Sequence, residues 1–338
     1  MMNFMRREFS SIAKRILVTG ANGQIGTALI PALYEKFGKE NVFASDKDKP
    51  KLKKKDAGKF FLIDVTKITK LEKIIQDEKI NIIINLAAIL SAAGEKNPLL
   101  CRQVNNIGFE NCLDLAKKYK CMIFSPSSIA AFGEKCPKHN VPDDPPLLPR
   151  SIYGVTKVYN ELLGKYYKDK FGVDFRCIRY PGIMSSEEYE YHGTTDYSTE
   201  IFFKAIREKK YTCYLTENTP LPLIHMDDAL RATTQFLDAD SSKMKRCVYN
   251  LAGMSLTPKM FYEEIKKIVP DFTISYKPDH RQAIADSWPA SINDEAAKEW
   301  GWNFKMTIKE LVPKMYKEIV SFEEARIAAG RKPIDQGH

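Results

Sequence analysis

The stretch "VTGANGQIG", residues 18–26, decides how the first half of this chain is interpreted. It follows an apolar run and places glycines at positions 20, 23 and 26, after which apolar residues recur at four-residue spacing as far as Gly38. This pattern predicts a buried strand, a tight turn and a helix in direct succession. Glycine lets the backbone approach an anion, and the N–H groups at a helix N-terminus attract negative charge. The stretch therefore predicts a site for the pyrophosphate of a dinucleotide.

Beyond this turn, apolar segments alternate with amphipathic ones at a regular pitch. Strands are expected at 41–46, 59–65, 80–88, 121–125 and 173–180, and helices around 71–75, 97–119 and 151–171. Continuously apolar strands separated by helices indicate βαβ units and a parallel sheet that is covered on both faces. The sequence thus predicts an α/β protein whose residues 15–180 form a doubly wound Rossmann domain.

After Tyr180 the alternation becomes less regular. A smaller, mainly substrate-binding domain is expected over residues 181–325, with segments at about 223–252 returning to the Rossmann domain. Residues 326–338 are expected to form a tail. Residues 1–14 contain arginines, serines and apolar residues at helical spacing, and they resemble a short mitochondrial targeting segment. A frayed leader is the alternative, in which case the protein would be cytoplasmic.

Composition narrows the classes of function. The 52 basic and 43 acidic side chains are interleaved, so the net charge of +9 favours solvated loops over a nucleic-acid site. The longest apolar run is too short to span a membrane. The seven cysteines form no CxxC pair and the five histidines no HExxH motif, which favours free thiols in a reducing compartment and no metal site.

Asp46 ends the second expected strand, 20 residues after Gly26. A carboxylate there can accept hydrogen bonds from the adenosine ribose and would repel a 2′-phosphate, so NAD is favoured over NADP, although Lys47 and Lys49 argue the other way. The other cofactor positions of this half are Asn22, Gln24 and Ile25 in the glycine turn, Asp64 and Val65 after the third strand, and Leu86, Ala87 and Ala88 after the fourth. For Asp64, a helix-capping role before Thr66 is an equal alternative.

The stretch "SIYGVTK", residues 151–157, places Tyr153 and Lys157 four residues apart on one helical face. A neighbouring ammonium stabilises a phenolate, so the pair could remove the proton of an alcohol while hydride departs. Ser128, in the strand-end stretch "SPSSIAAFG", could hydrogen-bond the reacting oxygen. The alternative is a surface tyrosine and lysine with an unrelated turn serine.

Together with the glycine turn and Asp46, the stretches "NLAA", "VNNIGFEN" and "IRYPG" make residues 15–325 resemble the extended short-chain dehydrogenases/reductases. The resemblance implies that Ser128, Tyr153 and Lys157 are catalytic and that Lys157 also holds the nicotinamide ribose. It further implies that Asn105 supports the lysine through a water. The residues that it places along the cofactor are Ser127, Tyr180 and Pro181.

A second set of stretches, "ILSAAGEKNP", "RYPGIMS", "GTTDY" and "ADSWPASINDEAAKEWGW", is similar to the short-chain type of L-threonine 3-dehydrogenases. This resemblance implies NAD-dependent oxidation of the threonine β-hydroxyl to 2-amino-3-oxobutyrate. It also implies a homodimer through the helices that contain Asn105 and Tyr153. The implied substrate contacts are Ser91, Ser128, Tyr153, Thr194, Thr195 and Trp288.

Several points of this second resemblance stay open. Thr194 and Thr195 could instead cap the next helix, and Trp288 could be a core residue. Before "GTTDY" the chain has "SSEEYEYH", residues 185–192, where the resemblance leads us to expect a loop richer in glycine and proline. The rival functions are a nucleotide-sugar epimerase or dehydratase with the same tyrosine and lysine, and an idle dinucleotide-sensing or RNA-binding protein.

Overall fold

The computed structural model describes residues 13–50, 58–189, 191 and 193–334. The chain divides into two units, and each is assembled from separate stretches of the sequence. The first unit comprises Met1–Ala88, Ile107–Ser125 and Gly164–Arg176, and the second comprises Ile89–Asn106, Pro126–Leu163 and Cys177–His338. The domain boundaries expected from the sequence stay a prediction. The candidate targeting segment lies outside the described residues, apart from positions 13 and 14.

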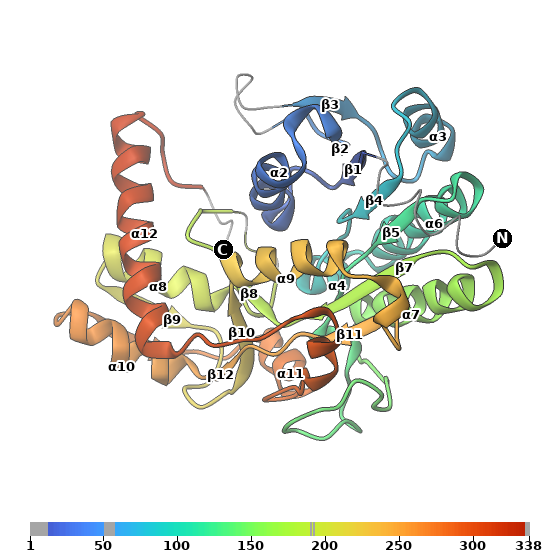
Figure 1. The fold of residues 1–338 in the computed structure, drawn as a ribbon. Helices are drawn as coiled ribbons and strands as arrows, with labels where there is room; N and C mark the ends of the chain where they lie inside the picture. Colours follow the sequence, from blue (N-terminus) through green and yellow to red (C-terminus); the bar gives the residue numbers. More distant parts are fainter. Residues whose placement is uncertain (1–12, 51–57, 190, 192, 335–338) are drawn as a thin grey trace. The chain divides into compact units, whose positions relative to one another are not determined.

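The first unit is built on a parallel sheet (Figure 1). Its strands are β1 (Ile16–Thr19), β2 (Val42–Asp46), β3 (Lys59–Leu62), β4 (Ile82–Asn85), β5 (Met122–Phe124) and the beginning of β7 (Phe175–Tyr180). β1 lies between β2 and β4, β3 pairs with β2, and β5 lies between β4 and β7. β1 and β4 are buried along their whole length, as expected of strands covered on both faces. The predicted doubly wound α/β fold is confirmed.

The helices of the first unit follow the predicted order, with small differences at their ends. They are α2 (Gln24–Phe37), the 3₁₀ turn η1 (Lys39–Asn41), α3 (Ile68–Asp77), α6 (Gly108–Tyr119) and the last part of α7 (Ile152–Phe171). α2 contains Pro31 and is followed by its C-cap Gly38, whose φ of +84° suits a residue without a side chain. β3 ends at Leu62, earlier than expected, so Asp64 and Val65 lie in the following turn.

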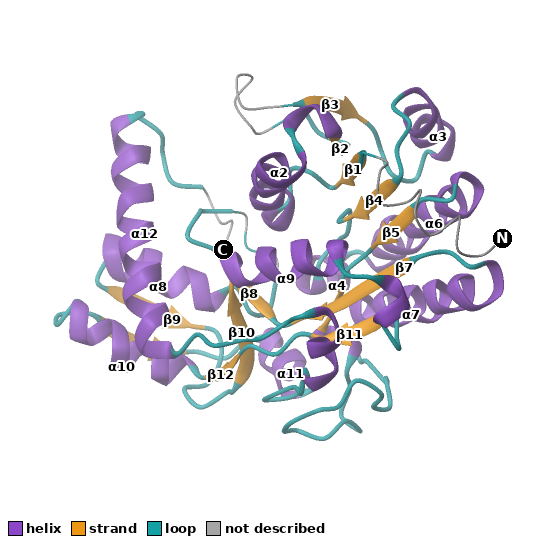
Figure 2. Ribbon diagram, in the orientation of Figure 1, coloured by secondary structure: helices purple, strands orange, loops and turns teal. Residues whose placement is uncertain are grey.

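The second unit holds the remaining elements (Figure 2). Its helices are α4 (Ser91–Lys96), α5 (Pro98–Arg102), the π turn η2 (Gln103–Ile107), η3 (Ile129–Ala131), the start of α7, α8 (Tyr197–Arg207), α9 (Met226–Asp238), η4 (Ser241–Lys243), α10 (Pro258–Ile268), α11 (His280–Asp286), η5 (Glu295–Trp300) and α12 (Ile308–Ala328). Its strands are β6 (Ser127–Ser128), the end of β7, β8 (Gly182–Met184), β9 (Lys210–Cys213), β10 (Leu221–His225), β11 (Val248–Asn250), β12 (Met254–Leu256) and β13 (Thr273–Tyr276).

Three strand groups organise the second unit. β6 and β11 both pair in parallel with the end of β7, so part of the 223–252 segment joins the strand that continues from the first unit. β10 pairs in parallel with β8 and antiparallel with β12, and β9 pairs with β13. The single helix expected over 97–119 is in fact α5, a π turn and α6, although Asn97 caps it and Pro98 opens it as predicted.

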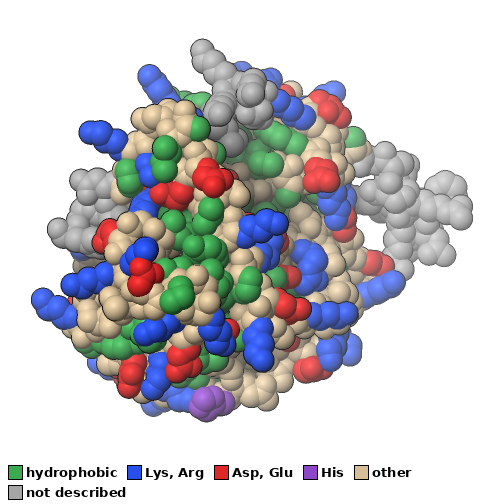
Figure 3. Space-filling view, turned by 90° about the vertical axis from the view of Figure 1, so that its left-hand side faces the viewer, with side chains coloured by type: hydrophobic (Ala, Val, Ile, Leu, Met, Phe, Trp, Pro, Cys, Tyr) green, Lys and Arg blue, Asp and Glu red, His purple; other side chains and the backbone are tan. Residues whose placement is uncertain are grey.

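All seven cysteines are free and buried. Burial raises the pKa of the Cys112 and Cys121 thiols to about 12. Basic and acidic side chains are interspersed on the face shown in Figure 3. Among the described residues, no helix has the length and apolar character needed to cross a bilayer.

Candidate active site

The glycine turn between β1 and α2 accepts no larger residue at its two ends. Gly20 has φ +70°, and a Cβ there would lie 2.6 Å from the backbone nitrogen of Ala87. A Cβ on Gly26 would lie 2.5 Å from the carbonyl oxygen of Gly20. Gly23 is the N-cap of α2 and has no side chain to accept a hydrogen bond from the first turn. A bound anion would accept hydrogen bonds from the N–H groups of this first turn in place of a capping side chain. The turn therefore fits the pyrophosphate of NAD.

Asp46 is tied to this turn within the first unit. Its Oδ2 accepts a hydrogen bond from the backbone N–H of Asn22 at 3.0 Å, and its Oδ1 accepts one from Asp48 at 3.1 Å. The Asn22 amide donates to the carbonyls of Asp48 and Lys49. Lys47, one of the two lysines that favoured NADP, is exposed and paired with Asp48 at 3.2 Å. A carboxylate in this register suits the ribose hydroxyls of NAD.

The other predicted cofactor positions of the first unit follow β3 and β4. Asp64 accepts hydrogen bonds from the backbone and hydroxyl of Thr66 at 2.9 and 2.8 Å. Partial burial raises the pKa of Asp64, but these bonds outweigh it and the pKa falls below its usual value. Since α3 begins at Ile68, the carboxylate closes a turn before the helix. Leu86 donates its N–H to Thr19, which holds the segment containing Ala87 and Ala88 at the end of β4.

In the second unit, Tyr153 and Lys157 share one face of α7 and are both buried, 9% and 6% exposed. The Lys157 ammonium lies 5.4 Å from the centroid of the Tyr153 ring and donates a hydrogen bond to the Pro126 carbonyl at 2.7 Å. Both side chains are thus withdrawn from water and lie against each other. The alternative of a surface pair is therefore wrong.

The two serines of β6 differ in their hydrogen bonding. Ser128 Oγ accepts the Ala130 N–H at 3.2 Å and so caps η3. Ser127 Oγ is buried and has no hydrogen-bond partner among the described residues. Buried hydroxyls almost always have a partner, so an orphan at a predicted nicotinamide-lining position fits a site that a cofactor completes.

Asn105 reaches the start of α7, which carries Tyr153 and Lys157, by a direct contact that the sequence did not reveal. Its Oδ1 accepts the Ile89 N–H at 2.8 Å, and its Nδ2 donates to the Thr156 hydroxyl at 3.0 Å. Thr156 in turn donates to the Tyr153 carbonyl at 2.7 Å. The only signal for Thr156 was its place between Tyr153 and Lys157 in the helix.

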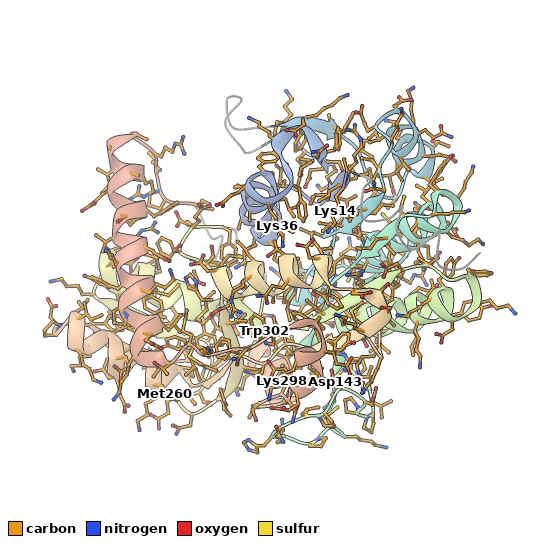
Figure 4. The ribbon with its side chains drawn as sticks, viewed as in Figure 1. Lys14, Lys36, Asp143, Met260, Lys298 and Trp302 are labelled. Atoms are coloured by element: carbon orange, nitrogen blue, oxygen red, sulfur yellow. The ribbon has the colours of Figure 1, made fainter. Side chains whose placement is uncertain are left out.

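Arg179 and Glu161 form a second contact that sequence patterns did not predict. Glu161 lies one turn beyond Lys157 on α7 and binds Arg179 of β7 through two hydrogen bonds of 2.9 and 2.7 Å. Arg179 also donates to the carbonyl of Asp143, which is labelled in Figure 4, and to the side chain of Asn250. Burial raises the pKa of the Asp143 carboxyl. The pair fixes α7 against the strand that leads to Tyr180 and Pro181.

Tyr180 is buried at the end of β7, and its hydroxyl contacts that of Thr233. Burial raises the pKa of Tyr180 far above its usual range, which keeps the phenol neutral. Pro181 follows directly and leads into β8. The two residues stand where the resemblance implies, and their contact with the cofactor stays a prediction.

Two of the predicted substrate contacts lie close together in the second unit. The hydroxyls of Ser91 and Thr194 are 3.4 Å apart, and both residues are buried. Asp196, rather than either threonine, is the N-cap of α8. The helix-capping alternative for Thr194 and Thr195 is therefore not what the structure adopts.

Trp288 belongs to a buried apolar cluster and is 6% exposed. Its carbonyl accepts a hydrogen bond from Lys138 at 2.9 Å. This environment agrees with the alternative of a core tryptophan. Its contact with substrate stays a prediction.

His225, Asp227 and Glu318 bring three possible metal-binding side chains together. His225 Nδ1 accepts the Asp227 N–H at 3.2 Å, and Nε2 lies 3.1 Å from Glu318. The Lys314 ammonium contacts both carboxylates. A side-chain cation thus already pairs with both carboxylates of this group. Sequence spacing could not reveal the group, because Glu318 of α12 lies far along the chain from His225 and Asp227.

Comparison with known proteins agrees with these features. Residues 16–252 match the family described as NAD dependent epimerase/dehydratase. The chain is 41% identical over 316 residues to the mitochondrial L-threonine 3-dehydrogenase of Bos taurus, which covers 93% of this chain and 85% of that protein. The crystal structure of L-threonine dehydrogenase from Phytophthora infestans has a TM-score of 0.88 and 41% identity, over 91% of this chain and 99% of that one. A monomeric L-threonine 3-dehydrogenase from a metagenome has a TM-score of 0.87 and 46% identity, with the same coverage.

The match spans most of the chain, and it includes the glycine turn, Asp46, Asn105, Tyr153 and Lys157. The family resemblance and the NAD cofactor predicted from the sequence are confirmed. The roles of individual residues remain predictions. The chain belongs to the NAD-dependent epimerase/dehydratase family.

Proposed function

We propose that this protein is an L-threonine 3-dehydrogenase that uses NAD to oxidise the β-hydroxyl of L-threonine. The observation that carries the proposal is the buried Tyr153 and Lys157 pair on α7, with the ammonium 5.4 Å from the ring centroid. The activities of the similar proteins named above support the choice of threonine.

In the proposed reaction, Tyr153 accepts the proton of the β-hydroxyl as the Cβ–H bond breaks. Lys157 stabilises the negative charge on the tyrosine oxygen, and its hydrogen bond to Pro126 holds the ammonium in place. Ser128 orients the hydroxyl. NAD, when bound, accepts the hydride from Cβ. The substrate loses one proton and one hydride, which gives 2-amino-3-oxobutyrate.

Substrate recognition is assigned to hydroxyl donors in the second unit. The carboxylate of threonine requires hydrogen-bond donors, and the buried hydroxyls of Ser91 and Thr194 lie close enough to serve the same group. Thr195 would extend this set.

The test is the absorbance of NADH at 340 nm during incubation of the protein with NAD and L-threonine. We expect turnover with NAD and much slower turnover with NADP. Tyr153→Phe should lose all but about a hundredth of kcat or less, as befits the loss of a general base, while its affinity for NAD stays the same. Turnover of UDP-sugars in place of threonine would support the epimerase alternative, and full activity of Tyr153→Phe would exclude the role of that residue.

We also propose a homodimer in which α7 and the α5–η2 segment meet their mates. Several large apolar side chains on these segments are exposed: Leu99, Leu100, Ile107, Val155, Tyr159, Leu162 and Tyr166. Four of these side chains lie on α7 alone, and exposed apolar side chains in such number are typical of an interface. Sedimentation equilibrium at micromolar concentration tests the dimer, and a single species of about 38.6 kDa would exclude it.

Mitochondrial import is a separate proposal. Residues 1–14 have the arginine and serine content of a targeting segment. N-terminal sequencing of the native protein tests it, because cleavage within or just after this segment is expected on import. An intact Met1 in protein from isolated mitochondria would contradict processing.

A further inference from the structure

The loop between β8 and α8, residues 185–193, leads directly into Thr194 and Thr195. Its two ends are tied to the start of α8. The Ser185 N–H donates to the Thr199 hydroxyl at 3.2 Å, and the Gly193 N–H donates to Asp196 Oδ2 at 2.6 Å. We call the described residues of this segment, 185–189, 191 and 193, the 185–193 loop. Apart from Gly193, they belong in the sequence to the acidic and aromatic stretch that departs from the expected glycine-rich pattern.

Glu188 gives the same loop a third attachment, at the opposite end of α8. Its Oε1 accepts a hydrogen bond from Arg207 at 2.7 Å, and its Oε2 accepts the Ile334 N–H at 3.1 Å. Arg207 is the last residue of α8, about 12 Å along the helix from Thr199 at 1.5 Å per residue. The loop is therefore held at both ends of the helix that follows it.

The cation that holds Glu188 is itself fixed by α12. Arg207 donates through Nε and Nη2 to both carboxylate oxygens of Glu323, at 2.9 and 2.7 Å. Arg326 binds the same carboxylate at 3.0 and 2.9 Å. Arg207 thus binds two carboxylates, and Glu323 binds two guanidinium groups.

The Glu188 side chain is 3% exposed and that of Glu323 is 7% exposed. Because water and salt screen withdrawn charges less than exposed ones, these contacts are stronger than ordinary surface pairs. If Glu188 lost its cation, its carboxylate would be better solvated in water than in this buried position. We expect the loop around Glu188 to move toward the solvent with it.

We propose that Arg207 is a positioning residue for the substrate: by holding Glu188 it fixes the 185–193 loop, and through it the hydroxyls of Thr194 and Thr195. The inference rests on the proposed function, since it assigns these hydroxyls to threonine. Arg207 acts through the loop, because its guanidinium binds Glu188 and Glu323 and not the threonine hydroxyls. Its loss should weaken threonine binding and leave NAD binding unchanged.

The competing explanation is that Arg207 only stabilises the fold. Substitution of each of the two carboxylates that Arg207 binds distinguishes this explanation from a positioning role. Glu188→Gln and Glu323→Gln each remove one negative charge with almost no change of shape. Only Glu188 belongs to the loop, whereas Glu323 belongs to α12. A structural role predicts that both variants lose stability and keep the KM for threonine.

Kinetics provide the first measurement. A charged hydrogen bond of this kind is worth about a tenfold change in binding, so the KM of Glu188→Gln for threonine should rise about tenfold. Its kcat should stay within about twofold, and its Kd for NAD should not change. The KM of Glu323→Gln should stay near that of the unmodified protein. Equal KM values for the two variants would overturn the proposal.

Amide hydrogen exchange of peptides covering residues 185–196 provides a second measurement that needs no substrate. Exchange should be faster in Glu188→Gln than in Glu323→Gln or the unmodified protein. Unchanged exchange in Glu188→Gln would show that Glu188 does not hold the loop, whatever the KM values are. Absence of threonine turnover by the unmodified protein would instead overturn the proposed function, so the two failures are distinguishable.

Discussion

Arg179 and Glu161 form an ion pair in which both side chains are at most 5% exposed and two hydrogen bonds of 2.7 and 2.9 Å join them. The pair connects β7 to the helix that carries Tyr153 and Lys157. Burial of charge is costly, and it is tolerated at this position because the guanidinium also binds Asp143 and Asn250.

The first prediction concerns this pair. Glu161→Gln should lower the free energy of unfolding by about 3 to 5 kcal/mol, because it leaves the Arg179 charge buried without its partner. The double variant Glu161→Leu with Arg179→Met should lose less stability than the sum of the losses in the single variants Glu161→Leu and Arg179→Met. Urea denaturation followed by circular dichroism measures both. Additive losses would mean that the residues do not act as a pair.

The second prediction compares two glycines with nearly the same backbone angle. Gly20 and Gly172 have φ of +70° and +71°, but only at Gly20 would a Cβ meet other atoms, the closest 2.6 Å away. Gly172→Ala should therefore cost only the strain of a left-handed residue, about 1 kcal/mol. Gly20→Ala should cost more and should abolish NAD binding, as measured by fluorescence titration. NAD binding of normal strength in Gly20→Ala would contradict the assignment of the glycine turn.

The third prediction concerns the Thr156 hydroxyl, which joins Asn105 to the carbonyl of Tyr153. Thr156→Val keeps the shape and removes the hydroxyl, so a buried amide hydrogen of Asn105 loses its acceptor at a cost of about 1 to 3 kcal/mol. We expect kcat to fall about tenfold or more in Thr156→Val, because this contact positions the start of α7, where Tyr153 lies. Thr156→Ser retains the hydroxyl and should keep most of the activity. Similar kcat values for the two variants would show that the hydroxyl is not needed.

The fourth prediction is a pH dependence of stability. Hydrogen bonds from Arg207, together with those from Arg326, lower the pKa of Glu323 to about 2 from its ordinary value of 4.5. A carboxyl whose pKa is lower in the folded state stabilises the fold above its unfolded pKa, and this stabilisation is lost as the pH falls toward the folded value. The unfolding free energies of the unmodified protein and Glu323→Gln should therefore differ most above pH 5.

Below pH 4.5 this difference should shrink, and it should vanish near pH 2. Thermal unfolding in buffers from pH 3 to 7 measures the trend wherever both proteins are folded. A difference that stays constant across this range would show that the ionisation of Glu323 is not its cause.

The sequence predicted the glycine turn and most of the parallel strands because their signals are local. Only glycine fits the close approach between Gly20 and Ala87, and strands buried on both faces are apolar throughout. The Tyr153 and Lys157 pair was predictable for a similar reason, since helical spacing alone places both on one face. Local pattern did not reveal that the helix expected over 97–119 is interrupted by a π turn at Asn105. The Asn105 side chain forms hydrogen bonds with the backbone N–H and carbonyl of Ile89.

Long-range contacts account for most of what could not be predicted from the sequence. The Arg207 tether joins residues 188, 207 and 323, and no spacing rule connects them. The stretch 185–192 is notable in the sequence only as a departure from an expected pattern. Among its acidic residues, Glu188 is explained only by the structure, where Arg207 binds it together with Glu323 of α12.

The seven buried thiols can report on local and global unfolding of the protein. Because a thiolate, not a thiol, attacks alkylating reagents, cysteines such as Cys112 and Cys121 should be silent in the native state and reactive only in molecules that expose them. The number of labels that mass spectrometry counts on each molecule would then distinguish local breathing, which exposes one sulfur, from cooperative melting, which exposes them all.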